Sequence, residues 1–191
     1  MLEGFPGVTE IVSLDSAPDM TVRCPAPQVT ADEEALPFGE AGFDLALSLH
    51  ALHLVNDLPG ALIQLRRVLK PDGLLLAVFP GGATLTELRQ AWLAAETELR
   101  GGASPRVAPF TDVRDAGALL QRAGFALPVA DAETITVTYK NPLALMSELK
   151  AMGQSNVLVE RSRTPVTRRL LMRAADIYAG RFALSNGRVP A

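Results

Sequence analysis

The residues of this chain best suited to chemistry are acidic side chains at the expected ends of β-strands. Asp15 follows the strand-like stretch 10–14, and Asp32 follows a short strand expected near Val29 and Thr30. In open α/β sheets, ligands gather at the carboxyl ends of the strands, and one carboxylate can accept hydrogen bonds from both hydroxyls of a ribose. The sequence leaves two roles open for Asp15, a ribose contact or a cap for the turn that follows it.

Two histidines, His50 and His53, lie three residues apart after an apolar stretch. We expect them to pack near a strand end rather than to act in catalysis. No carboxylate or thiol stands where it would clearly supply a third ligand, so we predict no metal site. The single cysteine, Cys24, excludes an internal disulfide.

Arginines in the second half of the chain offer a different chemistry. Arg106 could engage an acidic group, because a guanidinium forms charge-assisted hydrogen bonds with carboxylates. The alternative for Arg106 and Arg89 is a solvated loop or helix surface, which we favour more for Arg89.

The stretch 31–82 has the element order of the back half of a nucleoside-binding α/β domain. An acidic turn precedes an apolar strand at 43–49, and a helix at 58–69 follows with Asp57 as its N-cap. A turn at 70–73 then leads to a second apolar strand. We therefore predict a parallel βαβ unit whose first strand is central and covered on both faces.

The rest of the chain is mainly helical by its pattern. Helices are predicted at 84–100, at 112–123, from a cap at Asn141 to Gly153, and at 165–179. The alternation of β-branched residues at 134–139 predicts a half-buried strand that is antiparallel or at a sheet edge.

Bulk properties indicate one globular domain over residues 1–191, with a core at 10–82 and a helical region at 83–191. The chain has 191 residues and 48% hydrophobic content, which suffices for a substantial core. Its net charge of −3 argues against nucleic acid as a partner. No apolar run suggests a membrane span and no leader is evident, so we expect a cytoplasmic protein.

Four motifs resemble the class I S-adenosylmethionine-dependent methyltransferases, which have a Rossmann-like α/β sheet. They are LDSAPDM at 14–20, ADEEALPF at 31–38, FDLALS at 43–48 and LKPDGLLLAVFPGG at 69–82. More narrowly, LHLVNDLPGAL, GGATLTELR, AETE, GGASPRVAPF, LLQRAGF and MGQSN resemble the complex I assembly factor 5 group, whose relatives include the malonyl-carrier-protein methyltransferases. The resemblance covers nearly the whole chain.

This resemblance implies S-adenosyl-L-methionine as the cofactor and assigns roles to particular residues. Asp15 matches the acid that holds the ribose hydroxyls, and Asp32 matches the acid that accepts from the adenine amino group. The remaining matches on the cofactor side are Glu33 at the adenine ring and Ser48, Leu49 and His50 beside the methionine portion. The matches on the substrate side are His53, Gly81, Gly82, Arg89 and Arg106. Leu54 stands where the group usually has an aromatic residue.

The chain departs from that family at both ends, where the family has a first strand with a glycine-rich loop and a last strand. The first strand is the centre of the family's sheet, and its absence would leave buried backbone groups unpaired at about 1–3 kcal/mol each. We therefore expect that residues are omitted at both ends. Otherwise the strand at 43–49 must pair directly with the strand before Asp15 or with a neighbouring copy, which favours a homodimer.

Three functions follow from the resemblance and stay open. The first is an S-adenosylmethionine-dependent methyltransferase acting on a small molecule, a carrier protein or a protein. The second is an assembly factor that methylates or hydroxylates a subunit of respiratory complex I. The third is a binding protein that has lost the cofactor loop and does no catalysis.

Overall fold

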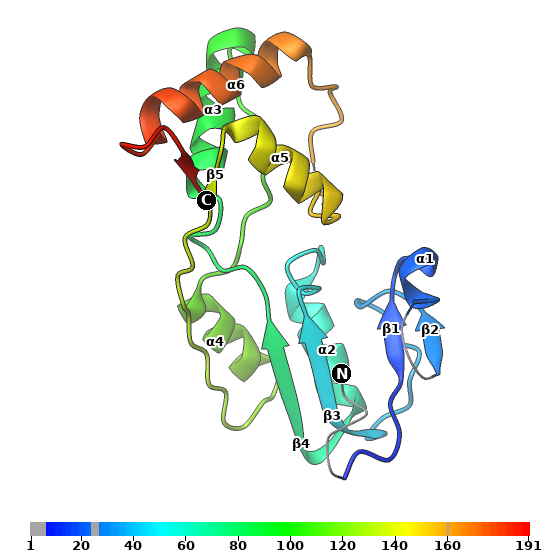
Figure 1. Cartoon of the computed structure of the whole chain (residues 1–191). Coiled ribbons are helices and arrows are strands. Elements are labelled where there is room, and N and C mark those ends of the chain that lie inside the picture. Colours follow the sequence, from blue (N-terminus) through cyan, green and yellow to red (C-terminus); the bar gives the residue numbers. More distant parts are fainter. Residues whose placement is uncertain (1–6, 24–26, 160) are drawn as a thin grey trace. The chain divides into compact units, whose positions relative to one another are not determined.

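The computed structural model of the chain describes residues 7–23, 27–159 and 161–191. Cys24 therefore lies outside the described residues. The chain forms two compact units. The first unit contains the chain up to Val78 together with Leu119–Leu127, and the second contains Phe79–Ala118 and Pro128–Ala191. Each unit is described by itself (Figure 1).

The first unit begins with a small parallel sheet. Strand β1 (Ser13–Asp15) pairs with β2 (Gln28–Thr30), and the short helix α1 (Pro18–Thr21) connects them. The Thr21 hydroxyl donates to the backbone oxygens of Asp15 and Ala17, at 3.3 and 3.1 Å. These bonds hold α1, which has four residues, against the end of β1.

A second parallel sheet in this unit contains the predicted βαβ unit. Strand β3 (Phe43–Leu49) pairs with β4 (Leu69–Val78), and α2 (Leu58–Val68) joins them. The predicted N-cap is confirmed, because the Asp57 carboxylate accepts a hydrogen bond from the backbone N–H of Gly60 at 2.9 Å. The strand β4 begins directly at the end of α2 and includes residues 70–73. The predicted turn is present there as an irregularity, because the register passes from Phe43–Leu69 to Leu45–Leu74 and Asp72 has a left-handed φ of 62°.

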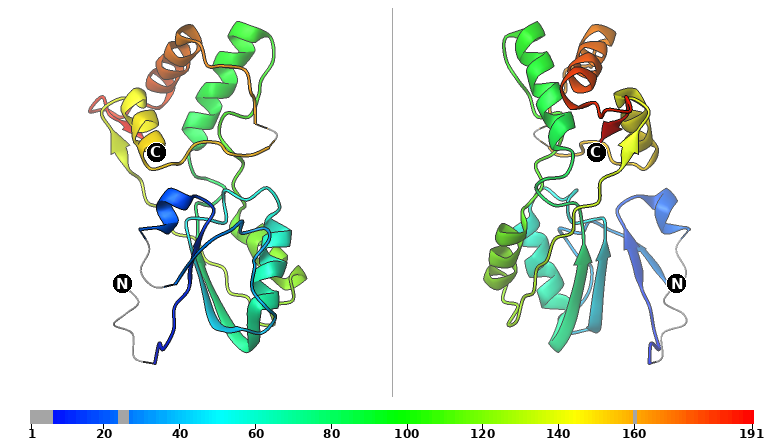
Figure 2. Two further views of the ribbon diagram at one scale, coloured as in Figure 1. Left: turned by 90° about the vertical axis from the view of Figure 1, so that its right-hand side faces the viewer. Right: turned by 60° about the vertical axis from the view of Figure 1, so that its left-hand side comes forward.

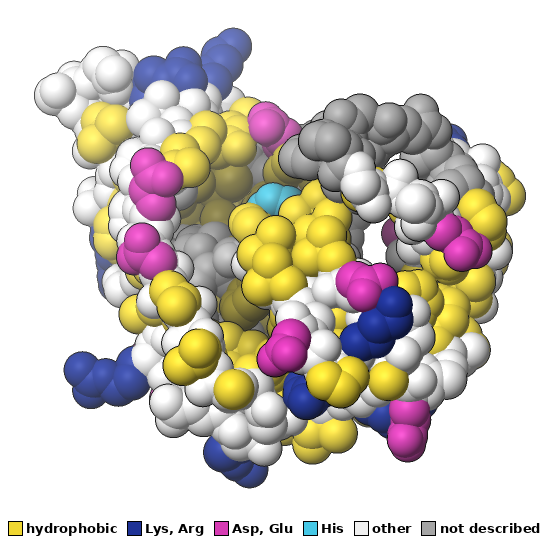
Figure 3. Space-filling model, turned by 90° about the horizontal axis from the view of Figure 1, so that it is seen from below, with side chains coloured by type: hydrophobic (Ala, Val, Ile, Leu, Met, Phe, Trp, Pro, Cys, Tyr) yellow, Lys and Arg dark blue, Asp and Glu magenta, His cyan; other side chains and the backbone are white. Residues whose placement is uncertain are grey.

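The prediction that 43–49 is central and covered on both faces is wrong for the described structure. The two parallel pairs form separate sheets, and β3 pairs with β4 alone. Leu45 is 40% exposed and Leu49 is 63% exposed. Hydrophobic side chains also lie next to one another in the view of Figure 3, in keeping with the many exposed apolar residues. The apolar run 43–49 correctly predicted a strand, but not how many neighbours the strand has.

The second unit is a helical layer with its own core. Helix α3 (Thr86–Arg100) packs against α6 (Arg168–Phe182), and α5 (Pro142–Ala151) contacts α6 as well (Figure 2). The caps predicted from sequence are present: Gly101 ends α3 with a φ of 70°, and Asn141 caps α5 with Pro142 at its first position. The core side chains are Leu88, Ala91, Trp92, Ala95, Leu145, Leu170, Ala174, Ile177, Tyr178 and Val189.

A short antiparallel pair completes this unit. Strand β5 (Thr138–Tyr139) pairs with β6 (Val189–Pro190) in antiparallel orientation, one of the two arrangements predicted for 134–139. The strand is shorter than predicted, and Ile135 and Val137 before it are exposed rather than half-buried. The buried Tyr178 hydroxyl donates to the backbone oxygen of Pro190, and burial raises the pKa of Tyr178 to about 12. Helix α4 (Val113–Arg122) contributes residues to both units and has no buried residue. Within the described residues, no helix is both long enough and apolar enough to cross a membrane.

Candidate functional site

The acidic residues predicted from the strand ends lie at one rim of the β1–β2 sheet. Residue 15 pairs with Thr30 in a parallel register, and the backbone N–H of Ala31 donates to the Asp15 backbone oxygen at 3.3 Å. Asp32 follows one residue later. Because both strands run in the same direction, Asp15 and Asp32 extend from neighbouring carboxyl ends.

Each of these carboxylates is held by a turn of its own backbone. The Oδ1 atom of Asp15 accepts from the N–H of Ala17 at 2.8 Å, and the Oδ1 atom of Asp32 accepts from the N–H of Glu34 at 2.9 Å. Asp15 therefore does cap its turn, as one of its two sequence-based roles required. The second oxygen of each carboxylate has no hydrogen-bond partner in the part of the chain that the structure describes. The turns thus orient both acids and leave acceptor atoms for a ligand that donates hydrogen bonds.

Glu33 adds a third carboxylate to this rim. Burial raises the pKa of Glu33 above its ordinary 4.5, and the charges of Asp32, Asp15 and Glu34 raise it further, against a lowering by a backbone hydrogen bond. Asp15, which is distant in sequence, is therefore within electrostatic reach of Glu33. Such a concentration of negative charge favours a ligand that is rich in donors or carries positive charge.

The residues at the end of β3 lie in the same unit but differ in exposure. Ser48 and His53 are each 9% exposed, whereas Leu49 and His50 are exposed. The backbone of His50 is left-handed with a φ of 56°, and its N–H donates to the Val78 backbone oxygen at 2.8 Å. The burial of His53 agrees with the expectation of a packed histidine near a strand end.

Glu34 is a site residue that the sequence predictions missed. Its carboxylate oxygen Oε1 accepts hydrogen bonds from the backbone N–H groups of Asn56 and Asp57, the second at 3.1 Å. The loop after β2 is therefore joined to the segment before α2. The signal in the sequence was weak, because a glutamate beside Asp32 and Glu33 looks like one more solvated acid.

Four predicted site residues, Gly81, Gly82, Arg89 and Arg106, belong to the second unit and are placed only within it. Arg89 is partly buried: its Nη2 donates to the backbone oxygens of Thr84 and Ala108, both at 3.4 Å, and its guanidinium lies 5.8 Å from the centre of the Phe110 ring. It is thus not on a solvated helix face.

Arg106 does engage an acidic group, and that group is in its own chain. Its Nε donates to Glu96 at 2.7 Å, and its side chain is only 10% exposed. Ser104 donates to the same carboxylate through its N–H and its hydroxyl, at 2.7 and 2.6 Å. A second nitrogen of Arg106, Nη2, is buried without a partner among the described residues.

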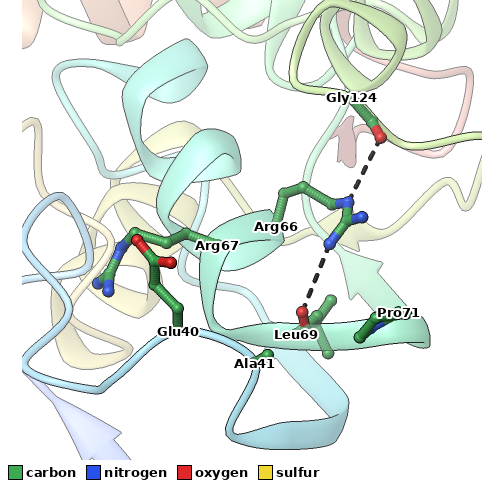
Figure 4. A pocket seen from close by; sticks show the side chains of 7 residues that line it. All are labelled: Glu40, Ala41, Arg66, Arg67, Leu69, Pro71 and Gly124. Atoms are coloured by element: carbon green, nitrogen blue, oxygen red, sulfur yellow. Dashed lines mark hydrogen bonds between the residues drawn. The ribbon is translucent and has the colours of Figure 1, made fainter.

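A pocket in the first unit lies away from the acidic rim, the edge of the β1–β2 sheet that carries Asp15, Asp32 and Glu33. It has a volume of about 500 Å³. Figure 4 shows that Arg66, one of its two arginines, donates hydrogen bonds to the backbone oxygens of Gly124 and Leu69. The lining residues are Glu40, Ala41, Arg66, Arg67, Leu69, Pro71 and Gly124. These residues surround the start of β4, whereas Asp15, Asp32 and Ser48 stand where strands end. We therefore place the candidate ligand site at the acidic rim and not in this pocket.

The donor and acceptor groups at the rim fit an adenosine better than a metal ion. Two carboxylates with free oxygens on neighbouring strand ends can accept from ribose hydroxyls and from an adenine amino group. In the described ranges, no group of three or more His, Cys, Asp or Glu side chains is arranged to hold a metal ion.

Comparison with known proteins identifies the fold and the domain. Residues 3–77 match the family model of the methyltransferase domain. The fold is similar to that of the YcgJ protein from Bacillus subtilis, with a TM-score of 0.58 and 18% identity over 95% of this chain and 77% of that chain. It is also similar to a Bacillus halodurans protein assigned as a methyltransferase, with a TM-score of 0.53 and 20% identity over 86% of this chain and 71% of that chain.

Curated relatives match this chain at higher identity. The mitochondrial arginine-hydroxylase NDUFAF5 of Danio rerio is 42% identical over 184 residues, which are 96% of this chain and 57% of that protein. The human protein of the same name is 46% identical over 167 residues, which are 87% of this chain and 48% of that protein. The malonyl-acyl-carrier-protein O-methyltransferase of Halorhodospira halophila is 40% identical over 95% of this chain and 62% of that protein.

Residues 3–77 carry the methyltransferase domain, and the fold of the chain is that of the class I S-adenosylmethionine-dependent methyltransferases, with an α/β, Rossmann-like sheet that is small and incomplete. Within that class it is related to the NDUFAF5 proteins and to the malonyl-acyl-carrier-protein methyltransferases. The family implies S-adenosyl-L-methionine as the cofactor. The chain spans about half to three fifths of the length of these relatives.

The relatives also correct one expectation from the sequence. We expected a cytoplasmic protein, but the names of the NDUFAF5 relatives from fish, rat and human place those proteins in mitochondria. The cytoplasmic expectation is therefore wrong. It came from the absence of an evident leader, which is weak ground for naming a compartment.

Proposed function

We propose that this chain binds S-adenosyl-L-methionine at the acidic rim and belongs to an enzyme that transfers the methyl group to an acceptor carried by another protein. One observation carries the proposal. Asp15 and Asp32 stand at the tips of two neighbouring parallel strands, each held by its own turn and each with a free carboxylate oxygen.

The roles proposed for the residues follow from their chemistry. Asp15 would accept from the ribose hydroxyls and Asp32 from the adenine amino group, while Ser48, Leu49 and His50 would border the methionine portion. The cofactor supplies an activated methyl group on a sulfonium, so the protein needs mainly to align the acceptor and to exclude water. No catalytic triad is required for such a reaction. His53, Gly81, Gly82, Arg89 and Arg106 remain proposals for the substrate side.

The names of the relatives support a methyl acceptor that is carried by a protein. One group of relatives is named for a malonyl-acyl-carrier protein and the other for arginine hydroxylation. The second candidate function is therefore modification of an arginine in a partner protein, such as the complex I subunit that the sequence resemblance implies. It is favoured by the 42–46% identity to the NDUFAF5 proteins.

Titration calorimetry with S-adenosylhomocysteine tests the cofactor site. We expect the native protein to bind this product, and the variants Asp15→Ala and Asp32→Ala to bind it at least about ten-fold more weakly, because each loses a hydrogen bond to a charged acceptor. Asp19→Ala is the matched control, since Asp19 is exposed on α1. No binding by the native protein, or equal loss in all three variants, would contradict the proposal.

Mass spectrometry of candidate acceptor proteins from cells that lack the gene separates the two reactions. Loss of a methyl group from a carrier or protein would support methyl transfer, and loss of a hydroxyl group from an arginine would favour the second candidate. An unchanged pattern of both modifications would leave the non-catalytic binding protein as the better account.

Two further expectations also remain proposals. The organisation as a single domain, with a core at 10–82 and a substrate-side region at 83–191, is one of them. The other is a homodimer, which is supported by the exposed apolar side chains on β3 and β4.

A further inference from the structure

The carboxylate of Glu34 connects two segments that are far apart in the sequence. Its Oε1 atom accepts from the backbone N–H of Asn56, 22 residues away, and from that of Asp57, 23 residues away. Both ends of this connection lie in the first unit. One end is the turn that contains Asp32 and Glu33, and the other is the segment that leads from His53 into α2.

The other end of the connection is the N-terminus of α2, where the backbone N–H of Asp57 lacks the acceptor that a helix usually provides for it. Asp57 caps α2 through its side chain, which accepts from Gly60. In a capping box, the residue three positions after the cap returns a hydrogen bond to the N–H of the cap residue. That position is Gly60, which has no side chain. Glu34 therefore supplies the missing acceptor from a different loop, and its negative charge is favourable at this end of a helix.

The acidic loop is anchored to α2 at a second place as well. Arg67, in the last turn of α2, donates through Nη1 to the Phe38 backbone oxygen at 2.8 Å and through Nη2 to the Leu36 backbone oxygen at 3.0 Å. The Glu34 bonds hold the start of the loop, and the Arg67 bonds hold its later part. Of the two anchors, only Glu34 is adjacent to the proposed cofactor residues.

We propose that Glu34 is a positioning residue of the cofactor site. It holds the turn of Asp32 and Glu33 against the segment 53–57. The acceptor atoms for the adenine therefore keep a fixed position relative to the residues after β3. Asp32 itself is bonded to the backbone N–H of Glu34 at 2.9 Å, so a shift of Glu34 moves the carboxylate of Asp32 directly. This inference rests on the proposed cofactor site, but the connection itself exists without the cofactor.

The test compares Glu34→Ala, Glu34→Gln and the control Glu10→Gln in the native protein. Glu10 is an exposed glutamate of the same unit, and its replacement changes the net charge equally. Amide hydrogen exchange at Asn56 and Asp57, measured by NMR without cofactor, reports the connection. Calorimetry with S-adenosylhomocysteine reports the site, and the thermal midpoint reports overall stability.

In Glu34→Ala we expect exchange at both amides to be about ten-fold faster and binding to be about ten-fold weaker, which is the loss of roughly one charge-assisted hydrogen bond. Glu34→Gln should restore most of both, because a single amide oxygen can accept from both N–H groups. Glu10→Gln should match the unchanged protein.

Unchanged exchange in Glu34→Ala would overturn the connection, and faster exchange with unchanged affinity would overturn the positioning role. Failure of Glu34→Gln to restore binding, despite restored protection of the two amides, would also overturn the positioning role. If the unchanged protein binds no S-adenosylhomocysteine, the proposed function fails, and the exchange data still decide separately whether Glu34 holds the two segments together.

Discussion

The carboxylate of Glu96 is buried and accepts several hydrogen bonds. The residue is 1% exposed, and burial alone would raise its pKa. The hydrogen bonds from Ser104 and from Arg106 outweigh that effect, so the pKa of Glu96 lies below its ordinary 4.5. The carboxylate therefore stays charged, and it accounts for the buried position of Arg106.

The variant Glu96→Gln is expected to destabilise the second unit by about 3 kcal/mol, because Arg106 would then be a buried cation without its counter-charge. The folded-state pKa of Glu96 is lowered, so its contribution is complete above about pH 4.5 and is lost as the pH falls through the folded-state value. Urea unfolding at pH 7 and at acidic pH measures this, and the difference between the proteins should shrink in acid.

Glu98 provides the matched control for this prediction. It forms an ion pair with Arg173 at 2.7 Å, but the two side chains are 49% and 42% exposed. Exposed pairs contribute little because water screens them. A large effect of Glu98→Gln, or a pH-independent effect of Glu96→Gln, would contradict the account of the buried pair.

At the scale of elements, the β3–β4 sheet has one covered face and one open apolar face. In the observed register Leu45 pairs with Leu74 and Leu49 pairs with Val78. Residues two apart on a strand share a face, so these side chains lie on one side of the sheet together with Leu76. They are 40–63% exposed, which is high for an aliphatic side chain in a sheet.

If this face is the surface through which two copies associate, Leu76→Lys should separate them, because a lysine ammonium cannot be buried in an apolar contact without a partner. Light scattering on the separated protein measures the mass. We expect the unchanged chain at twice its 20.3 kDa and the variant at 20.3 kDa. Val129→Lys, at a position 90% exposed in the second unit, is the control. A monomeric unchanged chain would contradict the homodimer.

At the scale of the whole molecule, each unit has buried apolar residues of its own. Leu62 is 4% exposed in the first unit, and Leu145 is 1% exposed in the second. The chain has a single tryptophan, Trp92, which lies in the core of the second unit. Its fluorescence therefore reports the second unit, whereas far-ultraviolet circular dichroism reports helices and strands of both.

Leu62→Ala and Leu145→Ala should each cost about 2–5 kcal/mol, as expected for a cavity in a packed core. If the chain is a single domain, as proposed, each variant should lower the midpoint seen by Trp92 fluorescence and the midpoint seen by circular dichroism together. A fluorescence midpoint that Leu62→Ala leaves unchanged, while circular dichroism shows an earlier transition, would contradict the single domain.

The sequence by itself determined the local features of this protein. Asp57 as the cap of α2, Asn141 with Pro142 at the start of α5 and Gly101 at the end of α3 were all predicted, because caps depend on residues a few positions apart. The acids at the ends of β1 and β2 were located for the same reason. The motif resemblance also identified the family, since those motifs are contiguous in the chain.

Only the tertiary structure decided which distant groups meet. The bond from Glu34 to Asn56 and Asp57, the pairing of Arg106 with Glu96 and the exposure of β3 on one face depend on segments brought together by folding. Burial and charge pairing are properties of the assembled neighbourhood, so an apolar run such as 43–49 predicts a strand without showing how many elements cover it.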